Sequence, residues 1–186
     1  GKWNKGPGRK LTEAIEETLG KNRVIAEDLG VLVPAVKKLL KKTGWPGMRV
    51  LLFAFDGNPH NEHLPYNYES QNEVVYTGTH DNETIVGWWN SITAAERKLA
   101  RDYLCDHATP EEELYKCFIS LIMRSAARVC VIPMQDYMGL DNRFRMNKPS
   151  TVGMNWKWRI KKRDLTKKLQ KEIYDVTLRY GRKNWD

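Results

Sequence analysis

Amphipathic segments and short apolar runs alternate along the chain, and the amphipathic segments carry recognisable start or stop signals. Residues 11–19 place apolar side chains on one face and end at Gly20, whereas residues 34–43 begin with Pro34 and end at Gly44. Further helices are predicted by the capping-box pairs Thr93–Glu96 and Thr109–Glu112, by the helical spacing of residues 114–125, and by the apolar stripe of residues 164–180.

Four apolar runs are too short for helices and predict β-strands. They are Val24–Ala26, Arg49–Phe55, Val74–Thr77 and Val129–Ile132, and their composition indicates strands that are buried. Helices separate these strands, and parallel strands need long crossover connections of that kind. The sequence therefore predicts an α/β fold built on a parallel sheet.

Polar residues follow each of the four predicted strands. In chain order they are Glu27 and Asp28, then Asp56, then His80 and Asp81, and finally Gln135 and Asp136. The carboxyl ends of parallel strands form one edge of a sheet or barrel, and α/β proteins build their active sites at that edge. We therefore expect a functional site there.

Carboxylates accompanied by a histidine and aromatic rings suit carbohydrate chemistry. Cleavage of a glycosidic bond needs one carboxyl group as acid and a second as nucleophile or base. The chain has seven tryptophans and eight tyrosines, whose flat rings can stack on sugars. For any single tryptophan, burial in the core is the alternative; this applies to Trp88, Trp89, Trp156 and Trp158.

Composition and charge narrow the classes of partner. With 186 residues, of which 41% are apolar and 29% charged, the chain predicts one globular domain. No apolar run approaches the roughly 20 residues that span a bilayer, so no membrane partner is expected. The net charge of +8 raises the hypothesis of nucleic-acid binding. The basic residues lie in short runs, at residues 37–42 and 161–168, which favours solvated helix surface instead.

Neither the cysteines nor the histidines predict a metal site. The three cysteines form no C-x-x-C pair, so we expect buried thiols in a reducing cytoplasm; they are Cys105, Cys117 and Cys130. His60 and His63 flank Glu62 close to Asp56, but no helical pattern would hold that spacing around an ion. Phosphate-binding glycine motifs are also missing. The sequence predicts neither a metal nor another cofactor.

Five longer segments carry a more specific signal. They are "VIAEDLG" (Val24–Gly30), "GWPGMRVLLFAFDG" (Gly44–Gly57), "LPYNY" (Leu64–Tyr68), "VVYTGTHDNETIVGWW" (Val74–Trp89) and "MNKPSTVGMNWKWR" (Met146–Arg159). Together they resemble the 4-alpha-glucanotransferase family, the amylomaltases or disproportionating enzymes. The resemblance runs in order from "KGPG" (Lys5–Gly8) through Arg159 and so covers most of the chain.

The resemblance implies a fold, an activity and roles for individual residues. The family has a (β/α)₈ TIM barrel of the alpha-amylase clan, cleaves α-1,4-glucan bonds with retention and passes the glycosyl group to another maltooligosaccharide. By this resemblance Glu27 is the general acid/base, Asp81 stabilises the transition state, and His80 hydrogen-bonds sugar hydroxyls. The other polar residues near these positions are expected to bind substrate as well; they are Asp28, Asn82 and Asp56.

One departure from the family pattern is large. The family's nucleophilic aspartate lies in an R-x-D-H segment before "KGPG", and this sequence has none; its "CDHA" (Cys105–Ala108) falls between predicted helices. Four strands are half of the eight in a barrel, which typically takes about 250 residues. We therefore expect residues 1–186 to form a single partial domain, the C-terminal half of the barrel, that is inactive alone. Its open sheet edges favour self-association or pairing with the missing N-terminal half.

Several alternatives remain open at this stage. The chain could be a non-catalytic glucan-binding fragment, which would bind maltooligosaccharides without turning them over. Within the enzyme class, a hydrolase of the same clan is a rival to a transferase. A nucleic-acid-associated protein is favoured by charge alone, and it predicts strongly salt-dependent binding. The expected location is the cytoplasm, but the chain does not begin with methionine, so a plastid homologue with a transit peptide is also open.

Overall fold

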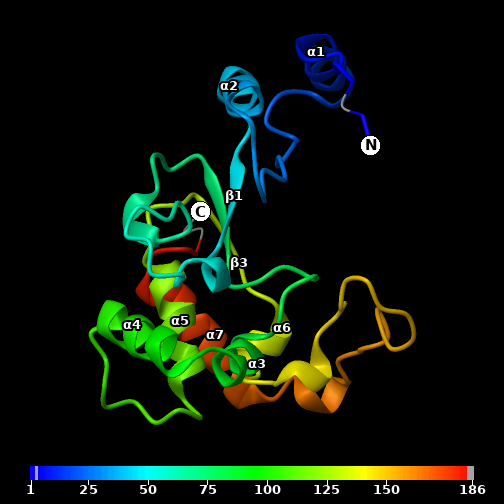
Figure 1. The fold of residues 1–186 in the computed structure, drawn as a ribbon. Coiled ribbons are helices and arrows are strands. Elements are labelled where there is room, and N and C mark those ends of the chain that lie inside the picture. The colour runs from blue at the N-terminus through cyan, green and yellow to red at the C-terminus, as the bar shows by residue number, and fades with distance from the viewer. Residues whose placement is uncertain (3, 184–186) are drawn as a thin grey trace.

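The computed structural model describes residues 1–2 and 4–183. It is built around a parallel sheet with the strand order β1 (Gly47–Val50), β2 (Glu73–Tyr76) and β3 (Val129–Val131), seen in Figure 1. The register pairs Val74 of β2 with Met48 on one side and with Val129 on the other. The prediction of an α/β fold with parallel strands is confirmed.

The helices precede, separate and follow the strands along the chain. Before β1 lie α1 (Arg9–Leu19) and α2 (Pro34–Thr43); between β2 and β3 lie α3 (Ile85–Ser91), α4 (Ala94–Leu104) and α5 (Leu114–Met123); after β3 lie α6 (Met134–Tyr137) and α7 (Lys167–Arg179). Short 3₁₀ turns occupy Leu51–Phe53, Pro65–Asn67, Asn142–Phe144 and Lys162–Asp164. The sequence did not predict α3 or α6. Among the described residues, no helix is long and apolar enough to cross a membrane.

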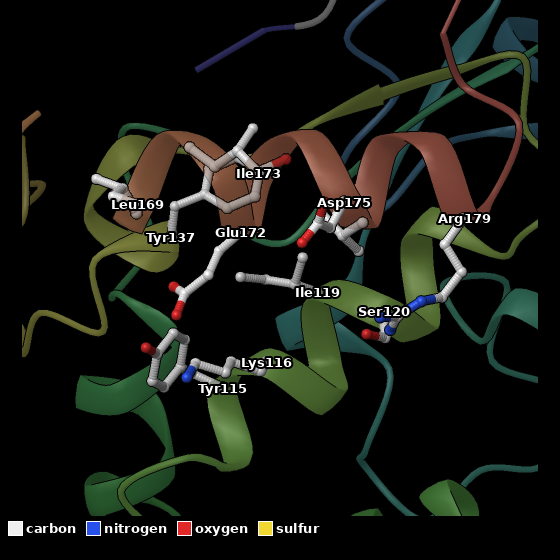
Figure 2. A pocket seen from close by; sticks show the side chains of 11 residues that line it. Tyr115, Lys116, Ile119, Ser120, Tyr137, Leu169, Glu172, Ile173, Asp175 and Arg179 are labelled. Atoms are coloured by element: carbon white, nitrogen blue, oxygen red, sulfur yellow. The ribbon is translucent and has the colours of Figure 1, made fainter. Parts of the chain in front are cut away.

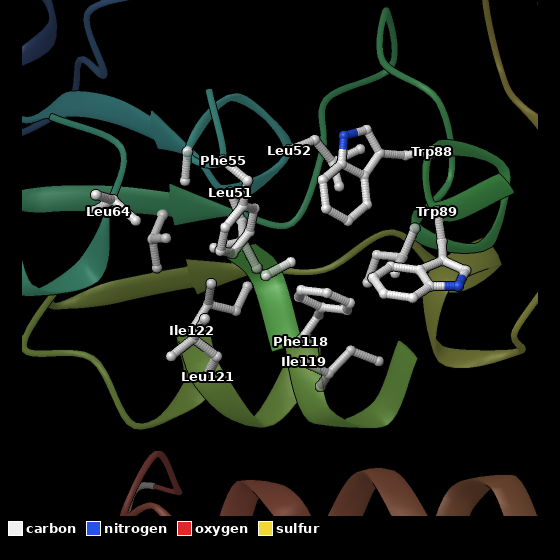
Figure 3. Close-up of a cluster of buried hydrophobic side chains, with 14 of the residues drawn as sticks. Leu51, Leu52, Phe55, Leu64, Trp88, Trp89, Phe118, Ile119, Leu121 and Ile122 are labelled. Carbon is white, nitrogen blue, oxygen red and sulfur yellow. The ribbon is translucent and has the colours of Figure 1, made fainter. Parts of the chain in front are cut away.

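The hydrophobic core lies between the sheet and α5, with α3 at one end (Figure 3). Phe118 and Ile122 of α5 are fully buried, and Trp88 and Trp89 of α3 are buried beside them. The rings of Trp88 and Phe118 meet edge to face at 5.4 Å between centroids. For Trp88 and Trp89 the core alternative is therefore correct, and neither ring is available as a sugar platform.

Residues 24–26 do not form the predicted first strand. The segment is irregular, although the Ala26 N–H donates to the Pro46 carbonyl at 2.9 Å, just before β1. The Asp28 carboxylate accepts the Met48 N–H of β1 at 2.6 Å. A side chain thus occupies a β1 donor that a neighbouring strand could otherwise use, and such side-chain bonds compete with sheet formation. The described residues therefore contain three of the four predicted strands.

The second and fourth predicted strands also differ from expectation. β1 ends at Val50, and the run continues as a 3₁₀ turn whose Leu52 N–H donates to the Thr77 carbonyl at 3.2 Å. In β3, Cys130 packs against the core, whereas Val129 and Val131 on the opposite side are each 41% exposed. The prediction of a buried strand is therefore wrong for the face of β3 that carries Val129 and Val131.

One of the two predicted capping boxes forms. Thr93 caps α4, since its hydroxyl accepts the Glu96 N–H while the Glu96 carboxylate accepts the Thr93 N–H at 2.8 Å. The second box, Thr109 with Glu112, does not form. Asp106 accepts both the N–H and the hydroxyl of Thr109, so that Thr109 belongs to a turn and α5 begins later, at residue 114.

The N-terminal helices lie at the periphery. Figure 1 shows α1 and α2 apart from the body formed by the later helices. Neither helix contains a buried residue, and Leu11 and Leu19 of α1 remain more than half exposed. The Trp45 indole N–H donates to the Glu16 carboxylate at 2.9 Å, which connects α1 to the segment before β1. Their amphipathic faces are therefore largely free of contacts in this chain.

The cysteines are only partly as expected. Cys117 and Cys130 are half-buried, and burial is the main reason why the pKa of each thiol is raised, for Cys130 to about 11. Cys105 is exposed, and it caps the C-terminus of α4 in the left-handed region with φ 52°. The expectation of three buried thiols is therefore wrong for Cys105.

Candidate active site

A cleft of about 1060 Å³ opens at the carboxyl edge of the sheet. Its lining combines the segment before β1 with the residues that follow β1, β2 and β3. Five of the six predicted site residues meet in it: Glu27, Asp56, His80, Asp81 and Asn82. Polar residues that follow different strands in the sequence thus lie around one concave surface.

The loop after β2 folds around Asn82. The side-chain oxygen of Asn82 accepts the backbone N–H and the hydroxyl of Thr79, each at 2.8 Å. The backbone N–H of Asn82 donates to the Thr79 carbonyl. A Cβ at Gly78 would lie 3.1 Å from the Asn82 Cβ, so glycine gives this turn the room it needs. The turn leaves the side chains of His80 and Asp81 about half exposed.

Asp81 is held by residues from a distant part of the chain. Its carboxylate accepts the Asn147 side-chain N–H at 2.7 Å and lies 3.3 Å from His80 Nε2. Arg145 donates to the Asp81 carbonyl at 2.9 Å, and the Asn147 N–H donates to the His80 carbonyl at 3.1 Å. Neither Arg145 nor Asn147 was singled out from the sequence. No local pattern marks them, although both lie in or beside the "MNKPSTVGMNWKWR" segment.

Trp156 lies against His80 at the surface. The ring centroids are 5.1 Å apart with an interplanar angle of 37°, and Trp156 is 51% exposed. Its backbone sits in the left-handed region at φ 62°, which is uncommon for an aromatic residue, and its N–H donates to the Met146 carbonyl at 2.7 Å. The core alternative is therefore wrong for Trp156, which offers an open aromatic face next to the cleft.

Glu27 and Asp28 are neighbours with different surroundings. Glu27 is exposed and lines the cleft. Burial raises the pKa of Tyr76, which also lines the cleft, and the nearby charge of Glu27 raises it further. Asp28 is turned away from the cleft. Besides the Met48 N–H it contacts Arg49 at 3.3 Å, and Arg49 in turn lies 2.7 Å from Glu73. The structure therefore does not bring Asp28 to the cleft with the other predicted site residues.

A Cβ at Gly47 would lie 2.4 Å from Asp28 Oδ2, so the close approach of this carboxylate requires glycine. The side chains of Asp28, Arg49 and Glu73 are 10%, 12% and 6% exposed, and buried charges persist when they are paired in this way. The network anchors the segment that carries Glu27 onto β1.

Asp56 and His63 complete one rim of the cleft. Asp56 Oδ1 accepts the Asn58 N–H at 2.9 Å in an exposed turn. His63 Nδ1 accepts the Val50 N–H at 3.1 Å, and burial, followed by the charge of Arg49, lowers the pKa of this imidazole. The ring is thus engaged in holding the end of β1. In residues 1–2 and 4–183, no group of three or more His, Cys, Asp or Glu side chains could hold a metal ion.

The polar pair after β3 is buried in α6. Gln135 and Asp136 retain 5% and 2% exposure, and the Asp136 carboxylate accepts the Ile85 N–H at 2.8 Å together with the Thr77 hydroxyl. Burial raises the pKa of Asp136 to about 6, an effect that the two hydrogen bonds oppose. Gln135 and Asp136 therefore lie beneath the loops around the cleft and contribute hydrogen bonds to them.

A smaller cavity of about 210 Å³ lies between α5 and α7 (Figure 2). Tyr115 of α5 and Tyr137 of α6 face Glu172 and Ile173 of α7 across it. None of the predicted site residues lines this cavity. It is separate from the cleft at the strand ends and belongs to the packing of α7 on the core helices.

The fold and the cleft place the chain among α/β proteins that carry their site at the carboxyl ends of parallel strands. The chain belongs to the 4-alpha-glucanotransferase family, glycoside hydrolase family 77, whose model matches residues 1–166. It is 45% identical to the 4-alpha-glucanotransferase of potato (Solanum tuberosum) plastids over 98% of this chain, and 44% identical to that of Thermus thermophilus over 86%. The resemblance to this family is confirmed.

Solved structures give the same result. The amylomaltase from Streptococcus agalactiae, solved in complex with acarbose, matches 99% of this chain with a TM-score of 0.91 and 35% identity. The Corynebacterium glutamicum amylomaltase matches 88% with a TM-score of 0.61; at 20% identity this likeness supports the fold alone. The chain covers 32% of the potato protein and 37% of the S. agalactiae one, so it spans about a third of their length.

Proposed function

We propose that this chain is the C-terminal part of a 4-alpha-glucanotransferase barrel and supplies two of its three catalytic carboxyl groups. The observation that carries the proposal is the meeting of Glu27 and Asp81 in one large cleft, within a chain of this family. The relatives' names describe transfer of α-glucan segments, and we extend that activity, with retention at the anomeric carbon, to the complete enzyme.

Three observations support the half-barrel interpretation. The chain spans about a third of its relatives, and the described residues hold three parallel strands where a (β/α)₈ barrel has eight. Val129 and Val131 leave a partly exposed apolar face on β3. Further strands of a barrel would cover this face and pair with the open edges, so the expected partners are the missing N-terminal half or a second copy of this chain.

In the proposed reaction Glu27 moves the proton. A nucleophilic carboxylate from outside this chain attacks the anomeric carbon while the glycosidic bond breaks, and Glu27 gives its proton to the departing sugar oxygen. In the second half, the 4-hydroxyl of an acceptor glucan returns a proton to Glu27 as its oxygen displaces the enzyme carboxylate. The exposed position of Glu27 in the cleft allows both transfers.

Asp81 acts through charge and hydrogen bonding. Its contacts with Asn147 and His80 restrain the carboxylate, so that it can bind sugar hydroxyls more strongly as the ring flattens towards an oxocarbenium ion. His80 and the exposed Trp156 lie together beside it and suit binding of a sugar hydroxyl and a sugar face. Asp56 and Asn82 are proposed to contact substrate at the rim of the cleft.

The test compares this chain with the complete enzyme on maltotriose. We expect the complete enzyme to produce glucose together with longer maltooligosaccharides, and the chain alone to leave maltotriose unchanged, although it could still bind glucans. Glu27→Gln in the complete enzyme should abolish most transfer, and near-normal transfer would overturn its role. Longer products from the chain alone would show that the nucleophile is present in it. Release of glucose without longer products would select a hydrolase.

The compartment remains a prediction. Relatives of similar identity come from plant plastids and from bacteria such as Clostridium butyricum, so the cytoplasm is one of two settings that family membership allows. The fractionation of the tagged full-length protein in its own cells distinguishes them.

A further inference from the structure

The loop that carries His80 and Asp81 has two fixed ends. Thr77, which follows β2 directly, is fully buried, and Ile85, the first residue of α3, is 1% exposed. Between them, residues 78–84 form the loop, and residues 78–82 of it line the cleft. The direction of the two exposed side chains therefore depends on how these two ends are held relative to each other.

One side chain contacts both ends. Asp136 of α6 accepts the Thr77 hydroxyl with one carboxylate oxygen and the Ile85 N–H, at 2.8 Å, with the other. Thr77 and Ile85 come from the opposite ends of the loop, and Asp136 lies more than 50 residues further along the chain. A buried carboxylate carries a desolvation cost, which two hydrogen bonds offset only in part. No ion pair to Asp136 exists among the described residues, so these two bonds are what its carboxylate holds.

The surroundings connect Asp136 with the front of the site. A small cavity of about 40 Å³ lies between Asp136 and the loop, and it is lined by His80 and Asn82 as well. The charged side chains around this cavity are Glu83 on the loop itself and Arg145 from the segment after α6, in addition to the His80 imidazole. Arg145 donates to the Asp81 carbonyl in the exposed part of the loop, whereas Asp136 accepts hydrogen bonds from the two buried ends of the loop.

We propose that Asp136 is a positioning residue for the site, because its carboxylate ties together the two ends of the loop that presents His80 and Asp81. Asp136 is not among the residues that line the cleft. The consequence for catalysis rests on the proposed function, since it matters only if Asp81 acts on the glucan. The consequence for loop order does not depend on that function.

The experiment uses the complete enzyme with three variants. Asp136→Ala removes both acceptors, Thr77→Val removes one donor while keeping the side-chain shape, and Asp136→Asn keeps an acceptor for Ile85 and a donor for the Thr77 hydroxyl oxygen. Asp102→Asn on α4 is the matched control, since this carboxylate is paired at the surface with Lys98. For each protein, kcat and KM for transfer from maltotriose are measured. Hydrogen exchange is followed by mass spectrometry in a peptide that spans residues 78–90.

We expect Asp136→Ala to lower kcat by ~100-fold, as for a misplacement of about 1 Å in a catalytic group, with a smaller rise in KM because His80 and Asn82 lie on the same loop. Amide exchange in the peptide should become about tenfold faster, because a hydrogen bond to a charged acceptor is lost. Thr77→Val should give smaller changes in the same direction, Asp136→Asn should recover most of kcat, and the control should match the wild type.

The outcomes separate this proposal from the proposed function. Unchanged exchange in both Asp136→Ala and Thr77→Val overturns the positioning role, whatever happens to activity. If Asp136→Ala does not fold, Thr77→Val and Asp136→Asn decide the question alone, because neither leaves a large cavity. Faster exchange with unchanged kcat also overturns the proposal. A wild-type enzyme that transfers no glucan defeats the proposed function, and the exchange data still test whether Asp136 orders the loop.

Discussion

Asn147 donates a hydrogen bond of 2.7 Å to the carboxylate of Asp81, although 66 residues separate them in the sequence. The same Asn147 donates its backbone N–H to the His80 carbonyl, so one residue holds both neighbours in the loop. Asp81 is half exposed and could otherwise rotate in solvent. The pair therefore fixes the orientation of the charge that we assign to transition-state stabilisation.

Replacing Asn147 by alanine should weaken catalysis more than folding. A hydrogen bond to a charged group contributes ~1.5–3 kcal/mol, and partial exposure of this one favours the lower value, which corresponds to a roughly tenfold loss in kcat/KM. Steady-state kinetics of the complete enzyme with maltotriose check this. Asn90→Ala, at an exposed position on α3, is the control and should behave as the wild type. Equal kcat/KM in Asn147→Ala and Asn90→Ala would contradict the assignment.

Asp28→Ala should destabilise the fold. Its buried carboxylate binds Arg49 and the Met48 N–H, and removal of one partner from a buried ion pair costs about 3–5 kcal/mol. The residue-level expectation from the sequence was substrate binding, which predicts a raised KM with unchanged stability. Urea denaturation separates the two. Asp175→Ala, in a surface pair with Lys171, should leave the unfolding midpoint unchanged. An unaltered midpoint in Asp28→Ala would restore the substrate-binding interpretation.

Local signals in the sequence were sufficient for part of the fold. The strand after Glu73, the helix that starts at Pro34 and the Thr93 capping box all follow from residues within a few positions of one another. Residues 24–26 have the composition of a strand, but a strand forms only with a neighbour, and Asp28 occupies a donor on the adjacent edge of β1. The strand failed because tertiary partners decide between a backbone and a side-chain hydrogen bond.

The position of the site could be predicted from the sequence, but the direction in which each carboxylate side chain faces could not. Polar residues after parallel strands must share an edge, so the meeting of Asp56 and Asp81 follows from topology. Glu27 lies after a segment that forms no strand, and it reaches the cleft because Asp28 binds that segment to β1. Whether a carboxylate at that edge faces the cleft or the interior depends on partners elsewhere, such as Arg49 for Asp28 and Ile85 for Asp136. These pairings are long-range in the sequence, and a one-dimensional pattern contains no signal for them.

The stability of the protein should carry a pH signature of Asp136. Burial raises the pKa of this carboxyl group from its ordinary value of 3.8, which applies to the unfolded chain, to about 6 in the folded protein. The folded protein therefore binds this proton more tightly than the unfolded chain does. The contribution to stability is complete below about pH 4 and is lost as the pH rises through about 6. A shift of this size corresponds to about 3 kcal/mol. Stability is measured by urea denaturation between pH 4 and 7.

In Asp136→Asn this dependence should vanish. The free energy of unfolding of the variant minus that of the wild type should therefore increase by up to about 3 kcal/mol as the pH rises from 4 to 7. Asp102→Asn serves as the control, because its surface carboxylate has a lowered pKa through its bond with Lys98 and cannot produce a change of this sign. Parallel pH curves for the wild type and Asp136→Asn would rule out a protonation change at Asp136 in this range.

Trp156 and Trp88 should respond in opposite ways to truncation. Trp156→Ala removes an exposed ring that lies beside His80, so KM for maltooligosaccharides should rise several-fold while stability changes little. Trp88→Ala removes a buried ring that contacts Phe118 and should cost ~3–5 kcal/mol of folding free energy. Thermal unfolding and kinetics on both variants check the contrast. A destabilised Trp156→Ala with unchanged KM would return Trp156 to a structural role.

The partly exposed face of β3 predicts association of the isolated chain. Val129 and Val131 expose apolar surface on an edge strand, and such edges pair with other strands when nothing covers them. Light scattering of the chain alone should detect dimers or larger species. The double substitution Val129→Lys and Val131→Lys should shift the population towards monomer, because lysine on an edge strand opposes pairing. Lysine at Leu11 and Leu19, apolar positions on α1 that are even more exposed, is the control and should leave association unchanged. A stable monomer of the unsubstituted chain at high micromolar concentration would contradict the half-barrel proposal.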